Sequence, residues 1–157
     1  MKFWKACLLL GLAGCGAGAL AQAPAAAQEP AQPVGRVKTV SGAATVSTQS
    51  QVVVAAVGTP VFQGSVIQTE KNASLGLTFK DSTVLSLGPD TRVQVDDYLY
   101  DPNQGQYKFG AQLGKGTLNY LSGAIAKARP QAVSVKTPSA VIGVRGTHLV
   151  VQAEEGP

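Results

Sequence analysis

The stretch ASLGLTFKDSTVLSL, residues 73–87, alternates apolar and polar side chains on both sides of a central turn. Asp81 and Ser82 supply the turn, because short polar side chains of this kind stabilise tight reversals of the backbone. Successive side chains of a strand point to opposite faces, so the pattern predicts a hairpin with one buried face. The side chains predicted to be buried are Leu75, Leu77, Phe79, Leu85 and Leu87.

Short alternating runs of the same kind continue through residues 34–153, with turn residues about every ten positions, as in all-β domains. Only 122–129 has the alanine content of a short helix. We therefore expect an all-β single domain of short, mostly antiparallel strands forming a sandwich, an open barrel or a β-roll. Residues 154–157 are assigned to a C-terminal tail. Strands are predicted at 37–46, 52–57, 61–69, 92–96, 107–113, 117–121, 133–137 and 140–152, and the strongest turn at 101–105.

The first 33 residues have the composition of an export segment followed by a tether. Lys2 and Lys5 precede the uncharged, apolar run 6–20, which predicts a signal peptide over 1–21 with cleavage before Gln22. Residues 12–15, LAGC, also resemble a lipobox, in which Cys15 would be lipidated and would anchor the protein to a membrane. Both alternatives remain open, and both predict an exported, periplasmic protein. The proline-rich residues 22–33 predict an extended tether.

Composition excludes several classes of function. Both cysteines lie within the first fifteen residues, so the rest of the chain has no thiol nucleophile, disulfide or cysteine zinc site. The net charge of +4 falls to +2, eleven basic against nine acidic residues, once Lys2 and Lys5 are set aside. That charge is too small for a nucleic-acid footprint, so no nucleic-acid partner is predicted.

The chain carries no recognisable catalytic constellation. His148 is the single histidine and lies in a strand-like run, which favours a half-exposed strand residue over a metal ligand. Asp96, Asp97, Asp101 and Asn103 are the best candidates for calcium ligands, yet their spacing does not fit an EF-hand loop. We therefore predict a protein that is not an enzyme, with no catalytic residue, cofactor or bound metal.

Three tyrosines lie close to the predicted turn at 101–105. Alternation places Tyr98 and Tyr100 on the same face of a strand, and Tyr107 follows the turn. These rings predict either a cross-strand aromatic pair that closes the edge of the core or a contact surface for carbohydrate or protein.

Four separate elements resemble the FecR-like domain. They are the stretch VKTPSAVIGVRGT at 135–147, GSVIQT at 64–69, the hairpin at 73–87, and the glycines of 114–123. The resemblance covers about 35–151 and implies an all-β domain outside the cytoplasm. In the best-known members this domain receives a signal from an outer-membrane receptor and passes it to a cytoplasmic anti-sigma segment. Here five residues precede the apolar run, so we expect a stand-alone exported domain that is also shorter at its C-terminus than many relatives.

The segment Gly143-Val144-Arg145-Gly146-Thr147 predicts a bulge or tight bend, because glycine adopts backbone conformations closed to other residues. Arg145 is expected to fix this bend by bonding either to a carboxylate, with Asp81 as the candidate, or to backbone oxygens. The alternative is that Arg145 presents its guanidinium to another protein.

The leading functional prediction is a non-enzymatic exported domain that serves as an envelope protein-interaction or sensory module. It implies an unidentified envelope protein as the partner, and contact with a membrane if Cys15 is lipidated. The alternative is an extracytoplasmic module that binds a glycan or a small anion, with Tyr98 and Tyr100 in the contact surface.

Overall fold

The computed structural model describes residues 31–155. The predicted signal peptide, Cys15 and residues 22–30 of the predicted tether lie outside the described residues. Residues 31–34 lead into the first strand. The strands are β1 (Gly35–Ser41), β2 (Ala44–Ser47), β3 (Val52–Val54), β4 (Pro60–Val61), β5 (Val66–Thr69), β6 (Ser74–Phe79), β7 (Val84–Leu87), β8 (Arg92–Asp101), β9 (Gln106–Leu121), β10 (Val133–Lys136), β11 (Val141–Gly143) and β12 (His148–Ala153).

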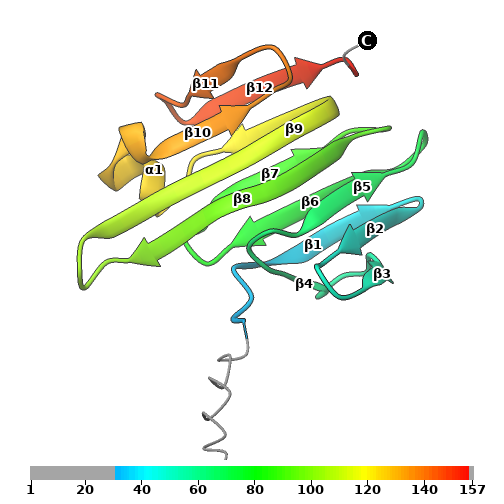
Figure 1. Cartoon of the computed structure of the whole chain (residues 1–157), viewed down its shortest axis with the longest axis horizontal. Coiled ribbons are helices and arrows are strands. Elements are labelled where there is room, and N and C mark those ends of the chain that lie inside the picture. The colour runs from blue at the N-terminus through cyan, green and yellow to red at the C-terminus, as the bar shows by residue number, and fades with distance from the viewer. Residues whose placement is uncertain (1–30, 156–157) are drawn as a thin grey trace, which may run out of the picture.

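The strands form one curled sheet whose two arms meet on the long strand β9 (Figure 1). The first half of β9 pairs with β8 and β10, and this arm continues through β5 and β2 to β3 and through β11 on the other side. The second half pairs with β7 and β12, and this arm continues through β6 and β1 to β4. All pairings are antiparallel except that of β9 with β10. The predicted all-β single domain is therefore confirmed, as a curled half-barrel.

The hairpin of residues 73–87 lies in the middle of the second arm. Leu75 pairs with Leu87 and Leu77 with Leu85, in register, across β6 and β7. All five apolar side chains predicted for the inner face are buried, and Ser82 takes the positive φ of 66° at the turn. Burying an apolar side chain of this size contributes about 1.5–3 kcal/mol, so this hairpin is a major part of the core.

Two strands predicted at 107–113 and 117–121 are one strand, and this prediction was wrong. The glycines between them bend the chain without ending it. Gly116 has a φ of 90°, and a Cβ there would lie 2.5 Å from the Cα of Thr91. The bend lets β9 leave the arm of β8 and join the arm of β7. It therefore sets the position of the segments that follow β9 in the chain.

Other predicted strands are divided by glycines or turns. The run 37–46 breaks at Gly42, where φ is 76°, and 61–69 contains a turn at Gly64, where φ is 83°. The run 140–152 contains β11 and β12, which lie in different arms. The predicted helix at 122–129 is present as α1 (Ala124–Ala128), followed by a 3-10 turn at Pro130–Ala132.

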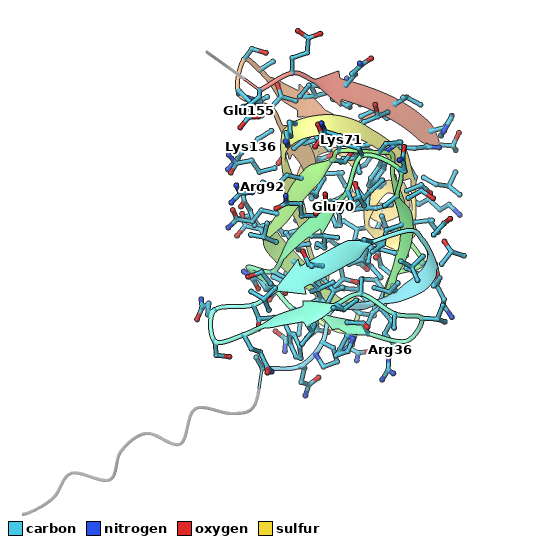
Figure 2. All side chains as sticks on the ribbon, turned by 90° about the vertical axis from the view of Figure 1, so that its right-hand side faces the viewer. Arg36, Glu70, Lys71, Arg92, Lys136 and Glu155 are labelled. Atoms are coloured by element: carbon cyan, nitrogen blue, oxygen red, sulfur yellow. The ribbon has the colours of Figure 1, made fainter. Side chains whose placement is uncertain are left out.

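Among the described residues, the core side chains come from within 34–153. Its largest fully buried side chains include Tyr120, Phe109, Ile67, Leu77 and Leu113, which come from both arms. This span supplies the core that the structure describes. Figure 2 shows Arg36, Arg92 and Lys136 pointing away from the sheet. No helix in the described part of the chain is long and apolar enough to span a membrane.

Candidate functional site: the loop 144–147 and its support

The loop 144–147 connects the last two strands and carries the Val-Arg-Gly-Thr part of the motif singled out in the sequence. It runs from β11 in one arm to β12 in the other, beyond β9. Val144 is buried, and its amide donates to the carbonyl of Val133 at 3.3 Å. Arg145, Gly146 and Thr147 are exposed. The loop is thus held at its start and open to solvent at the residues that follow.

Ser122, which directly follows β9, holds the other side of the loop. Its amide donates to the carbonyl of Thr147 at 2.9 Å, and its hydroxyl donates to the carbonyl of Gly146. Gly146 has a φ of 135°, a conformation that favours glycine and turns the chain into β12. These contacts fix the backbone on both sides of Arg145. Ser122 has no signal in the sequence, because its partners lie more than twenty positions away.

Arg145 does not pair with Asp81, so this part of the sequence prediction was wrong. The side chain of Arg145 is exposed and forms no ion pair with any residue in 31–155. Asp81 is buried at the β6–β7 turn, where its carboxylate is already bonded to closer partners. The bend is held by backbone bonds, which leaves the guanidinium free. Gly143 lies in β11 with an ordinary φ and open space around it.

Asp81 instead ties the hairpin to the start of α1. Its carboxylate accepts hydrogen bonds from the hydroxyl of Thr83 at 2.5 Å and the hydroxyl of Tyr98 at 3.1 Å. It also accepts the amide of Ile125 at 3.4 Å, and the Asp81 carbonyl accepts the amide of Ala124 at 2.7 Å. A buried carboxylate is tolerated when such donors replace water. The contacts with residues 124 and 125 place Ser122 and, through it, the loop 144–147.

The tyrosines lie at the edge of the core. Tyr98 stacks on Phe79 at a centroid distance of 5.5 Å and meets Phe109 edge-on at 6.3 Å. Tyr100 and Tyr107 pair directly across β8 and β9, with their ring centroids 6.1 Å apart. All three are partly buried and pack against the core. They form the aromatic cluster predicted as one alternative, and Tyr98 also uses its hydroxyl to bond Asp81.

Burial strongly raises the pKa of Tyr98 above its usual 10.0, and the Asp81 carboxylate raises it further. Burial also raises the pKa of Tyr120. The folded protein keeps these protons at pH values where the unfolded chain releases them. The stabilisation is therefore full below about pH 10 and is lost as the pH rises further.

Tyr98→Phe is expected to make the free energy of unfolding fall less steeply with pH above about pH 10 than it does in the unchanged protein, as measured by urea unfolding. An identical slope in both would contradict the assignment.

The acidic residues near the 101–105 turn each have a separate partner. Asp97 pairs with Lys108 at 3.0 Å and Asp96 with Lys136 at 3.6 Å. The carboxylate of Asp101 accepts the amides of Asn103 and Gln104 and so stabilises the turn. Within residues 31–155, no three His, Cys, Asp or Glu side chains gather in a way that could hold a metal ion.

Exposed apolar side chains lie on the strands that the loop 144–147 joins and at the end of β9. Val141 of β11 is 70% exposed and Val150 of β12 is 58% exposed. Leu121, which pairs with His148, is 47% exposed. His148 is exposed and contacts the amide oxygen of Asn119, as expected of a strand residue. An exposed arginine together with exposed valine and leucine is typical of a protein-contact surface rather than of a catalytic pocket.

The clearest polar hollow lies elsewhere, on the outer face of the arm that contains β5, β8 and β9. It encloses about 390 Å³ and is lined mainly by Gln68, Arg92, Gln94, Gln112 and Lys115. Lys115 is engaged by Asp90 at 3.0 Å and Glu155 at 3.6 Å. The predicted glycan-binding tyrosines do not line it.

Comparison with known proteins gives one family. The family model described as FecR protein matches residues 65–157. No curated protein and no solved structure matches the chain. The matched region contains the hairpin of Asp81, the bent strand β9 and the loop 144–147.

Proposed function

The chain belongs to the FecR protein family, and we propose that it works in the cell envelope as a non-enzymatic module that binds another protein. Membership of the family suggests an envelope sensory or signalling role. The predicted export signal supports a location outside the cytoplasm, either as a free periplasmic protein or anchored through Cys15. The proposal also names the surface that binds and the kind of partner that fits it.

The observation that carries the proposal is the exposed guanidinium of Arg145 in a loop with a fixed backbone. Bonds to Val133 and Ser122 hold the loop from both sides, so little backbone conformational entropy is lost when a partner binds. Arg145 is free to form a bidentate pair with a carboxylate. Val141 of β11 and Val150 of β12 add exposed apolar surface on the two strands that the loop joins. The partner that fits is a protein segment carrying a carboxylate among apolar residues.

Arg145→Ala is expected to weaken partner binding by about thirtyfold or more, the effect of losing an arginine at the centre of an interface. The melting temperature should hardly change, because exposed side chains without bonds contribute within about 0.5 kcal/mol of stability. Crosslinking in intact cells with Arg145→Ala, Arg145→Lys and the unchanged protein measures the first effect. Thermal unfolding of the purified proteins measures the second.

Arg129→Ala is the matched control, because Arg129 is also exposed but follows α1. Loss of capture with Arg145→Ala but not Arg129→Ala supports the proposal. Unchanged capture with Arg145→Ala contradicts it, and so does a lowered melting temperature that accounts for the loss. Persistent monomers with no crosslinked envelope protein would contradict the protein-binding function itself.

A further inference from the structure

The part of the chain that forms the β3 and β4 side of the domain has an unusual charge pattern. Between Glu29 and Glu70 there is no carboxylate, and Arg36 and Lys38 are the charged residues of that interval. Residues 39–69 carry no charge at all. Free sheet edges are protected by charged side chains, by proline or by being very short. Here β4 is only Pro60–Val61, whereas β3 (Val52–Val54) is short but has no charged residue of its own.

Arg36, Lys38 and Lys80 lie together at this end. Arg36 of β1 pairs with Pro60 of β4 on one side and with Thr78 of β6 on the other. Lys80 follows β6, and its amide donates to the carbonyl of Val34 at 3.0 Å. A groove of about 270 Å³ runs between the three cations, with Gly35 and Phe79 in its lining. Figure 2 shows Arg36 at the end of the domain where the chain leads into β1.

These three cations have no acidic partner within the described residues. Lys71, Arg92, Lys127, Arg129 and Arg145 have none there either, so what distinguishes these three is the groove that they share. Lys80 donates to the side-chain amide of Gln32 at 3.4 Å. A groove rimmed by three unpaired cations attracts anions.

Exposed valines lie on the segment that leads from β3 to β4. Val52 and Val54 of the edge strand β3 are 66% and 77% exposed, and Val57 is 68% exposed. Val57 is next to Gly58, whose amide donates to the carbonyl of Val37 at 2.8 Å, between Arg36 and Lys38. Segment 52–61 therefore crosses this end from the edge of one arm to the edge of the other (Figure 1). We call Arg36, Lys38, Lys80, Val52, Val54 and Val57 the basal surface.

We propose that the basal surface binds a bilayer that contains anionic phospholipid, with lipid phosphates at the three cations and the valines at the headgroup boundary. Residues 31–34 reach β1 at this surface, so the thirty residues before them, including the predicted export segment and Cys15, connect to the domain here. A bilayer fits both parts of the surface, because it offers phosphates and an apolar boundary side by side. The loop 144–147 lies on the other side of β9, so a domain seated in this way still presents Arg145 to a partner.

The test is flotation of the domain, residues 31–157, with vesicles of phosphatidylcholine alone or with added phosphatidylglycerol. Binding is expected with the anionic vesicles and should weaken as salt is raised. Arg36→Gln, Lys38→Gln and Lys80→Gln are each expected to weaken it about fivefold, and the triple variant about a hundredfold. The control triple variant, Lys71→Gln with Lys127→Gln and Arg129→Gln, removes the same charge from other exposed positions and should bind normally.

A second pair of variants tests the valines. Val54→Ser with Val57→Ser should weaken binding at every salt concentration, whereas Val141→Ser with Val150→Ser should not. Equal weakening by both charge triples would overturn the proposal, since it would indicate general attraction rather than a defined surface. Absence of vesicle binding would also overturn it. Dimers that form without vesicles and dissociate in Val54→Lys would instead assign the surface to a second copy of the chain.

Discussion

Asp81→Ala is expected to lower the free energy of unfolding by about 3–5 kcal/mol, because it removes the acceptor of a buried network. The carboxylate is 2% exposed and accepts hydrogen bonds from Thr83, Tyr98 and Ile125. Alanine would leave the hydroxyl of Thr83 and the amide of Ile125 without this partner inside the protein. Urea unfolding monitored by circular dichroism measures the difference.

Two further variants show whether the loss of stability comes from the hydrogen-bond network of Asp81 or from removing any aspartate. Asp81→Asn keeps an acceptor oxygen and should fall between aspartate and alanine. Asp96→Ala removes an aspartate whose ion pair with Lys136 is partly exposed, and it should cost less than about 1 kcal/mol. A change below about 1 kcal/mol for Asp81→Ala would mean that the network does not hold the hairpin to α1.

The sequence was sufficient to predict the hairpin because its information is local. Alternation with period two assigns Leu75, Leu77, Leu85 and Leu87 to one face without knowledge of any distant residue. The turn at 101–105 and the short helix after Ser122 are likewise set by neighbouring residues. All these elements are present where they were predicted.

Contacts between distant residues could not be predicted in the same way. Tyr98 lies seventeen positions from Asp81, and only the pairing of strands brings the hydroxyl and the carboxylate together. Asp81 was a candidate partner for Arg145, but the sequence does not show that Thr83 and Tyr98 already bond this carboxylate. The bend at Gly116 was taken as a break for a similar reason. Glycine signals an unusual backbone, but not whether the strand continues beyond it.

The same distinction applies to the candidate surfaces. The motif at 143–147 could be recognised in the sequence, while the exposure of this loop and its support by Ser122 required the structure. The basal surface joins β1, the segment 52–61 and Lys80, which are separated by up to forty-four positions between Arg36 and Lys80. No local pattern connects them.

Gly123→Ala should be as disruptive as the loss of Asp81, although glycine offers no bond to remove. A Cβ at residue 123 would lie 2.3 Å from the amide nitrogen of Thr83 and 2.5 Å from the carbonyl oxygen of Asp81. Both atoms belong to backbone, so relief requires the hairpin turn and the start of α1 to separate. We expect a loss of about 3 kcal/mol or more in the free energy of unfolding, at the upper end for overpacking.

Gly143→Ala is the control for Gly123→Ala, because it adds the same methyl group at a position with open space. It should change the free energy of unfolding by less than about 0.5 kcal/mol. In Gly123→Ala the neighbouring Ser122 must also shift, and its bonds to Gly146 and Thr147 should weaken. Amide hydrogen exchange in 144–147 is therefore expected to accelerate even where the domain stays folded. Unchanged exchange in that loop would show that the hairpin and the Arg145 loop are independent, and Asp81 would then have no part in presenting Arg145.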